Sequence, residues 1–169
     1  MKKILHVILI SLFSLTVISC AKKDDSTTTS SGLFVAVGDN GTILTSSDGT
    51  AWTSRTSGTS NGLYNIFYGN STFVAVGHSG TILTSSDGTT WTSRTSGTSE
   101  HLYGITYGNS TFVTGGYGGE ILTSSDNGTT WTSRTSGTTN ELHGVSNNLP
   151  LRPPDNLTAS RGTNTVTLD

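Results

Sequence analysis

The middle of the chain consists of three copies of one segment, and this repetition constrains the fold more than any other feature. Phe34, Phe73 and Phe112 begin the copies and lie 39 residues apart. Each copy holds short runs of β-branched and aromatic residues separated by Gly, Asn, Asp and Ser, a pattern typical of strands joined by tight turns. A repeat of this length with four short strands predicts a blade of a β-propeller.

The second copy predicts four strands, at residues 63–68, 73–76, 81–85 and 91–95. The first copy lacks the opening strand, and a fourth copy supplies only an opening strand at 142–145. We therefore expect an all-β fold of antiparallel strands, with three repeats of 39–40 residues between residues 33 and 148. Propellers typically contain about four to eight blades, so three blades predict an incomplete ring, or a homo-oligomer that completes it. A parallel β-helix is the structural alternative.

Composition argues against a helical repeat of similar length. The 169 residues include 25 Ser, 32 Thr and 21 Gly, and these residue types are poor helix formers. The formal net charge is −2 and no basic run follows the N-terminus, which argues against nucleic-acid binding. The single cysteine excludes an internal disulfide and a multi-cysteine metal site, and we expect no cofactor.

The N-terminus has the form of a bacterial signal peptide that ends at a cysteine. Lys2 and Lys3 precede a mostly apolar stretch at 4–18, which is shorter than the about 20 residues that span a membrane. Residues 17–20, Val-Ile-Ser-Cys, resemble the lipobox of bacterial lipoproteins. The resemblance implies a signal peptide at 1–19, lipidation of Cys20, and a polar tether at 20–32. An ordinary signal peptide with an incidental cysteine is the alternative.

The residues after Cys20 bear on where the lipid anchor lies. Ala21 stands where an aspartate would resemble an inner-membrane retention signal, so we expect a bacterial envelope protein anchored in the outer membrane. The following Lys-Lys-Asp-Asp, 22–25, is similar to the surface-export signals of some Gram-negative lipoproteins. It is equally consistent with a plain solvated tether, so a periplasmic and a surface-exposed location both stay open.

An aspartate and a tryptophan recur in the turn between the third and fourth predicted strands. Residues 124–131 match the Asp-box (BNR-like) pattern S-x-D-x-G-x-T-W, and the two earlier copies are one residue shorter. The wider unit, over roughly residues 33–145, resembles the repeats of photosystem II assembly and stability factors and their non-photosynthetic relatives. The aspartate is expected to accept hydrogen bonds from the turn, and the tryptophan to pack between strands or blades. These structural residues are Asp48, Asp87 and Asp126 with Trp52, Trp91 and Trp131.

One arginine follows each box tryptophan at the same repeat position: Arg55, Arg94 and Arg134. Assembly factors of the kind that the repeats resemble carry arginine patches for partner proteins, so the resemblance implies that these residues bind a partner. Arginine suits this role because its guanidinium can bind a carboxylate through two parallel hydrogen bonds. The alternative is a solvated arginine at a strand end that stacks on the neighbouring tryptophan.

Asp boxes also occur in sialidases, so a sialidase-like glycoside hydrolase is a remote alternative. A site made by divergence should break the repeat, whereas the three arginines obey it, so we expect no enzyme activity and no catalytic residue. His78, His101 and His143 occupy different repeat positions, which predicts no metal site. The tyrosines are either core-facing or form a binding face for sugar or peptide: Tyr64, Tyr68, Tyr103, Tyr107 and Tyr117.

The last segment, residues 149–169, resembles a linker followed by the opening of a fibronectin type III domain, with Pro153-Pro154, NLTAS and VTL in that order. The segment is too short for such a sandwich, which needs roughly 100 residues. The sequence as a whole predicts a non-catalytic envelope lipoprotein whose propeller blades bind or scaffold an envelope or extracellular protein. A surface adhesin or glycan-binding module is the alternative.

Overall fold

The computed structural model describes residues 32–148, where the regular elements are strands and short 3-10 turns. The predicted signal peptide, Cys20, nearly all of the tether and the fibronectin-like segment lie outside the described residues. No helix within 32–148 is long and apolar enough to span a bilayer.

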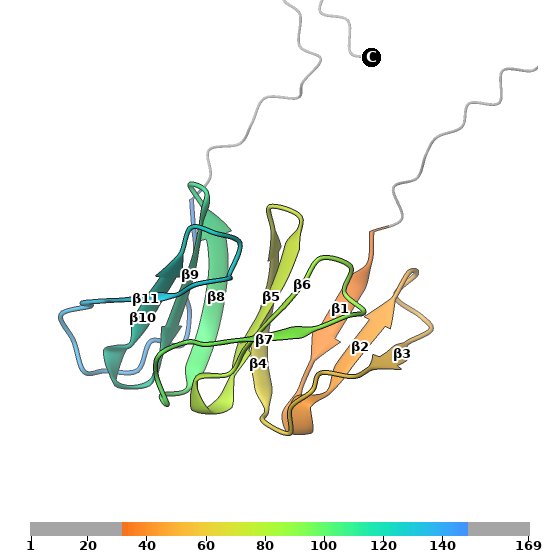
Figure 1. The fold of residues 1–169 in the computed structure, drawn as a ribbon, viewed down its shortest axis with the longest axis horizontal. Coiled ribbons are helices and arrows are strands. Elements are labelled where there is room, and N and C mark those ends of the chain that lie inside the picture. Colours follow the sequence, from red (N-terminus) through yellow and green to blue (C-terminus); the bar gives the residue numbers. More distant parts are fainter. Residues whose placement is uncertain (1–31, 149–169) are drawn as a thin grey trace, which may run out of the picture. The chain divides into compact units, whose positions relative to one another are not determined.

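The strands form three antiparallel sheets, which confirms the prediction of all-β propeller blades (Figure 1). Blade 1 holds β1 (Phe34–Val37), β2 (Ile43–Ser46) and β3 (Thr53–Arg55). Blade 2 holds β4 (Leu63–Gly69), β5 (Thr72–Gly77), β6 (Ile82–Ser85) and β7 (Thr92–Arg94). Blade 3 holds β8 (Leu102–Gly108), β9 (Thr111–Gly116), β10 (Ile121–Ser124) and β11 (Thr132–Arg134). Within the described residues the sheets are not closed into a ring, and blade 1 has no opening strand.

The two faces of each blade carry different apolar residues, because successive residues of a strand point to opposite sides of a sheet. In blade 2, Leu83 points toward blade 1 and packs with Ile43 in one buried cluster. Ile82 points the other way and packs with Leu122 of blade 3 in a second cluster. We call the face that meets the preceding blade the leading face, and the face that meets the following blade the trailing face. The other buried members are Leu63 and Ala75 in the first cluster, and Val74, Val76, Leu102, Ile105 and Phe112 in the second.

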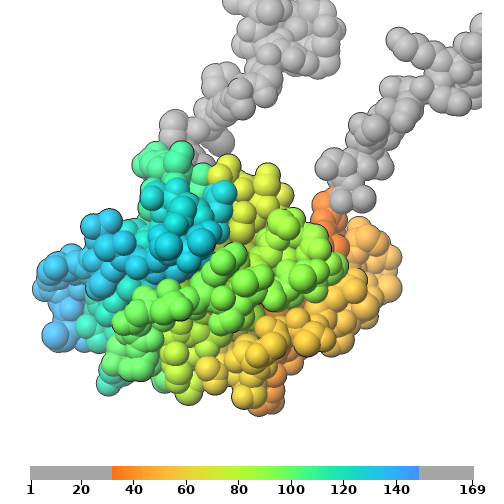
Figure 2. Space-filling model, viewed as in Figure 1, coloured from red at the N-terminus to blue at the C-terminus, as the bar shows by residue number. Residues whose placement is uncertain are grey.

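The opening strand of each complete blade lies against the blade before it, so the blades pack side by side (Figure 2). Leu63 N, at the start of β4, donates a hydrogen bond to Gly38 O of blade 1 at 3.0 Å. Strand β8 packs in the same way against β4 and β5. The opening strands therefore form the inner side of the array, and β3, β7 and β11 form its outer edge.

The sequence predicts that a fourth repeat begins with a strand at 142–145. These residues lie where an opening strand would lie, but they do not form a strand. No strand forms over 141–148. Leu142 N nevertheless donates to Gly116 O at 2.9 Å, the bond that Leu63 N makes to Gly38 O. An opening strand pairs with the strand that follows it, as β4 does with β5. Among residues 32–148 no strand is placed to pair with this segment.

A 3-10 turn joins the second and third strand positions of each blade, at η1 (Asp39–Gly41), η2 (His78–Gly80) and η3 (Tyr117–Gly119). The last glycine of each turn is closely surrounded. A Cβ at Gly80, where φ is +65°, would collide with the carbonyl oxygen of Thr98 and lie 2.7 Å from Ser96 Oγ. The turn therefore requires both the left-handed backbone and the missing side chain of glycine.

Replacing Gly80 with alanine is expected to destabilise the fold more than replacing Gly97 with alanine. Both glycines have positive φ, +65° and +80°, so either alanine adds about 1–2 kcal/mol of backbone strain. Only the alanine at 80 also meets neighbouring backbone, which adds about 1–3 kcal/mol, because nothing lies within 4 Å of a Cβ at 97. Urea unfolding of the two variants measures the difference, and equal losses of stability would contradict the close packing of η2.

Candidate functional site

Each Asp-box carboxylate holds its turn by accepting hydrogen bonds. In blade 2, Asp87 Oδ1 accepts from the backbone N–H groups of Thr89 and Thr90, both at 2.8 Å. Ser85 Oγ donates to the same carboxylate at 2.9 Å and accepts from Gly88 N at 2.8 Å. Blade 1 repeats all four bonds at the equivalent residues. These bonds fix the turn that joins the third and fourth strand positions of the blade.

Blade 3 accommodates one extra residue, Asn127, in this turn. Asn127 takes a left-handed conformation with φ of 59°. Asp126 Oδ1 still accepts from Thr130 N at 2.9 Å, and its Oδ2 accepts from Thr130 Oγ1 at 2.6 Å. The bond from the Thr130 hydroxyl is the main cause that lowers the pKa of Asp126 to about 2. In blades 1 and 2, bonds from backbone N–H groups hold the pKa of Asp48 and Asp87 well below the ordinary value.

The box turns also connect neighbouring blades. A Cβ at Gly128 would lie 3.2 Å from Val74 Cγ2 and 3.0 Å from Thr84 Cγ2, both on the trailing face of blade 2. The equivalent Gly88 makes the same kind of approach to Val35 of blade 1, at 3.3 Å. The box glycines of blades 2 and 3 therefore rest on the trailing face of the preceding blade.

The box tryptophans follow the same arrangement. Trp91 Nε1 donates to Gly88 O at 3.1 Å, and Trp131 Nε1 donates to Gly128 O at 2.9 Å. Their rings pack against the two apolar clusters between the blades. Trp52 belongs to blade 1, which has no blade before it in the described residues, and its ring is 44% exposed.

The three arginines end the outermost strand of each blade and share one geometry. Arg94 Nε donates to Thr84 Oγ1 of the neighbouring strand at 2.8 Å. Among residues 32–148 the only ion pair joins His143 and Glu141, so no carboxylate of this part of the chain neutralises the arginines. The other two bonds, both at 2.9 Å, join Arg55 to Thr45 and Arg134 to Thr123.

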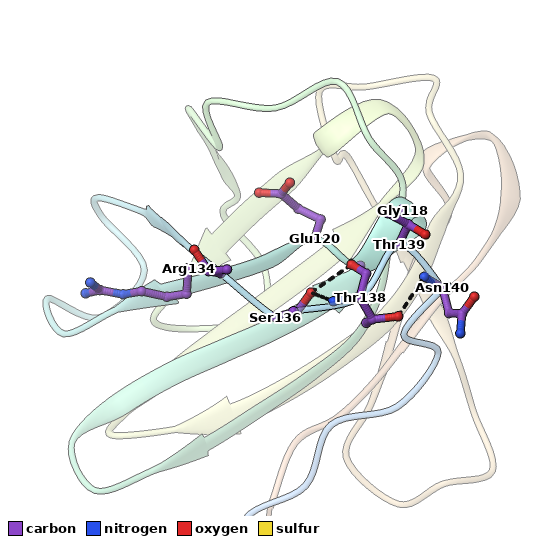
Figure 3. Close-up of a pocket in the computed structure, with 10 residues that line it drawn as sticks. Gly118, Glu120, Arg134, Ser136, Thr138, Thr139 and Asn140 are labelled. Atoms are coloured by element: carbon purple, nitrogen blue, oxygen red, sulfur yellow. Dashed lines mark hydrogen bonds between the residues drawn. The ribbon is translucent and has the colours of Figure 1, made fainter.

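A shallow groove lined mainly by hydroxyl and amide groups adjoins each arginine, and in blade 3 its lining also includes Glu120. In blade 3 the groove runs between η3 and the loop after β11, with Arg134 at one edge. Ser136 Oγ donates to Thr138 O at 3.1 Å, and Asn140 N donates to Thr138 Oγ1 at 3.0 Å, which fixes the loop. Figure 3 shows the Arg134 side chain pointing away from these residues. The equivalent grooves of blades 1 and 2 include Arg55 and Arg94.

The structure also brings together aromatic side chains that sequence reasoning left apart. Tyr64, Tyr103 and His143 share one repeat position, directly after the leucine that opens each repeat. The ring centroids of Tyr64 and Tyr103 lie 5.7 Å apart, and those of Tyr103 and His143 lie 4.9 Å apart. A register shift marks a β-bulge at both tyrosines, and a bulge turns a side chain in a new direction.

His101 lies at the centre of this group. Its ring centroid is 4.3 Å from that of His78 in η2 and 6.4 Å from that of Tyr117 in η3. Ser79 N donates to His101 Nδ1 at 3.0 Å, so this nitrogen acts as the acceptor. The repeat positions of His78 and His101 differ, yet the fold places the two rings side by side. We call the whole set the aromatic rim: Tyr64, His78, His101, Tyr103, Tyr117 and His143.

A comparison of the copies with one another would have found the aromatic rim. Between the box and the arginine the three copies are almost identical. The positions that differ in every copy include the first residue of the 3-10 turn (Asp39, His78, Tyr117) and the residue before the opening leucine (Gly62, His101, Glu141). Both positions lie at the rim. The repeat is therefore broken at this surface and obeyed at the arginines.

The carboxylates of Glu141 and Glu100 lie close enough to the aromatic rim to act on Tyr103. Desolvation raises the pKa of the Tyr103 hydroxyl, and the charges of Glu141 and Glu100 act in the same direction. Within the part of the chain that the structure describes, no three His, Cys, Asp or Glu side chains are grouped to hold a metal ion. The surface thus offers ring edges, imidazoles and nearby carboxylates to a ligand.

Blades of this repeat and topology match one described family. The DUF6242 beta propeller domain matches residues 57–167. This chain belongs to the DUF6242 beta propeller family. No curated protein matches it. The family match covers blades 2 and 3 of the DUF6242 propeller and continues past residue 148. The resemblances to lipoproteins, to photosystem II assembly factors and to a fibronectin type III domain stay predictions.

Acid is expected to weaken this DUF6242 propeller through its Asp boxes. A carboxyl group whose pKa is lower in the folded state stabilises the fold above its unfolded pKa, and that contribution is lost as pH falls through the folded pKa. We expect the thermal midpoint to fall as pH drops from the ordinary aspartate value of 3.8 toward about 2. Circular dichroism at a series of pH values measures this dependence.

A variant with Asn at 48, 87 and 126 tests the cause. The amide oxygen still accepts hydrogen bonds from the turn but does not titrate, so the thermal midpoint should depend less on pH in this range. Asp39→Asn removes one surface charge outside the boxes and is the matched control. An unchanged pH dependence in the triple variant would contradict the role of the box carboxylates.

Proposed function

We propose that this propeller is a non-catalytic binding and scaffolding module of a bacterial envelope, anchored through lipid on Cys20. The family supports a binding or scaffold module. The signal-peptide pattern and the lipobox-like residues before Cys20 support the location. The partner that we propose is an envelope or extracellular protein with acidic segments, bound along the row of arginines.

The observation that carries this proposal is the shared geometry of Arg55, Arg94 and Arg134. In each blade the Nε atom is held by a threonine, which orients the guanidinium plane and leaves its terminal nitrogens for a ligand. A guanidinium with these nitrogens available can bind a carboxylate through charge-assisted hydrogen bonds. Repetition on successive blades suits a partner that presents several carboxylates in a row.

The arginine row is tested with fluorescent poly-L-glutamate as the probe. Exchange of all three arginines to Glu is expected to weaken binding by about tenfold or more, because attraction is replaced by repulsion. Exchange to Lys keeps the charges but removes the planar fork, so this variant should bind with intermediate affinity. Fluorescence anisotropy measures the three affinities.

The matched control places glutamate at Ser54, Ser93 and Ser133, on the opposite face of the same strands. These side chains are exposed, so the control adds negative charge to the same region and keeps the arginines. If the serine variants lose as much affinity as the arginine variants, general charge explains the binding and the proposal fails.

The aromatic rim favours a second candidate function, the binding of a glycan. Tyr64 is 43% exposed and Tyr117 is 48% exposed, so both rings are accessible to a ligand. Aromatic rings with neighbouring carboxylates and imidazoles provide stacking surface and hydrogen bonds for sugar hydroxyls. Saturable binding of neutral oligosaccharides that is lost in Tyr64→Ala, together with weak binding of polyglutamate, would favour this alternative.

The lipid anchor is tested with Cys20→Ser in a bacterial host. The parent protein should fractionate with membranes and carry the added mass of acyl chains, because two or more chains anchor a protein stably. The Cys20→Ser variant should lose both the acyl mass and the membrane association that depends on it. Ser19→Ala, which keeps a small residue before the cysteine, is the control, and equal partition of all three proteins would contradict the anchor.

A further inference from the structure

Blade 1 exposes the leading face that the other blades bury. Phe34 is 54% exposed, whereas Phe112, at the equivalent position of blade 3, is fully buried. Trp52 is 44% exposed, whereas Trp131 packs against the cluster between blades 2 and 3. The leading faces of blades 2 and 3 are each covered by the trailing face of the preceding blade.

Blade 3 exposes the complementary trailing face. Val113 and Ile121 are partly exposed, whereas Val74 and Ile82, their equivalents in blade 2, are fully buried. The trailing face of blade 2 is covered by the box turn and the leading face of blade 3, as the approach of Gly128 to Val74 shows. The two ends of the array thus present the two halves of an interface that the chain already makes twice.

The backbone is incomplete at the same two ends. In blades 2 and 3 the second strand position pairs with an opening strand, so that Ile66 lies opposite Ala75 and Ile105 opposite Thr114. Strand β1 has no such neighbour among residues 32–148. Residues 141–148 have the sequence of an opening strand and pair with no strand within the described residues. Unpaired edges of this kind are sites where another chain adds a strand.

We propose that a second copy of this chain docks head-to-tail on these ends, with residues 141–148 of one copy adding the missing opening strand to blade 1 of the other. The repeat fixes the register: Val145 is equivalent to Ile66 and Ala36 is equivalent to Ala75, so Val145 pairs with Ala36 of the second copy. This self-association goes beyond the proposed partner binding and does not depend on it.

A second copy is the occupant that fits, because both halves of the contact are present in one sequence. The leading face of blade 1 carries Ala36 and Leu44 where blade 2 has Ala75 and Leu83, while the trailing face of blade 3 has Gly115 in place of Val76. Two copies of the three blades that residues 32–148 form make six, within the range of about four to eight in which propellers close. The contact is heterologous, joining a leading face to a trailing face, and two such contacts close a symmetric pair. One interface therefore covers both the apolar faces and the free strand edges.

The first measurement is the native mass of the full chain purified in mild detergent, over a range of protein concentrations. We expect a species of twice the chain mass. Phe34→Glu should convert it to the single-chain mass, because the substitution places a charge in the contact but lies on the surface of the separate chain. Tyr68→Glu, at a side chain that is also 54% exposed but lies on blade 2, is the control and should keep the pair.

The register is tested by mixing two single-cysteine variants in a Cys20→Ser background. Ala36→Cys mixed with Val145→Cys should form a covalent dimer under mild oxidation, seen on a non-reducing gel. Val37→Cys mixed with Val145→Cys should not, because the neighbouring residue points to the other face of the sheet. A single-chain mass at every concentration would overturn the proposal, as would equal cross-linking in the two mixtures.

Discussion

The Asp-box carboxylate accepts hydrogen bonds from the backbone N–H groups of its own turn. In blades 2 and 3 the turn held in this way places its glycine in contact with the preceding blade. In blade 3, Asp126 holds the turn through Thr130, and Gly128 then approaches Val74 and Thr84 closely. The buried cluster between blades 2 and 3 forms around this contact. A local hydrogen-bond pattern thus determines how each pair of sheets packs, and the rest of the array depends on it.

This dependence explains why the copies are alike in one region and different in another. From the box to the arginine the three copies are almost unchanged, and this segment holds the glycine and the tryptophan that meet the preceding blade in blades 2 and 3. The first residue of each 3-10 turn and the residue before each opening leucine lie outside the apolar clusters between blades, although His78 of blade 2 stacks against His101 at the start of blade 3. These positions differ in every copy, and in the structure they form much of the aromatic rim. The protein therefore combines a repeated framework with one surface that can be specific.

Much of the fold could be predicted from the sequence because the same strand and turn patterns recur in each copy of the repeat. The strand predicted at 73–76 is β5, Thr72–Gly77, and the strand predicted at 81–85 is β6, Ile82–Ser85. The prediction at 142–145 was wrong, because a strand also needs a neighbour, and local pattern carries no information about one. The contact between His78 and His101 was missed for a related reason. The two residues are 23 positions and one strand pair apart in the chain, and only the packing of β8 against η2 brings their rings to 4.3 Å.

The sequence by itself determined the period, the four strand positions and the box turns, because these depend on neighbours within a few residues. It also determined that the arginines would share one environment, since each follows the same strand and faces the same threonine. Tertiary structure decided which face of each blade meets which neighbour and which equivalent residues are covered. Phe34 and Phe112 occupy the same repeat position and have opposite exposure, because burial depends on the blade alongside, and that is a property of the assembled array.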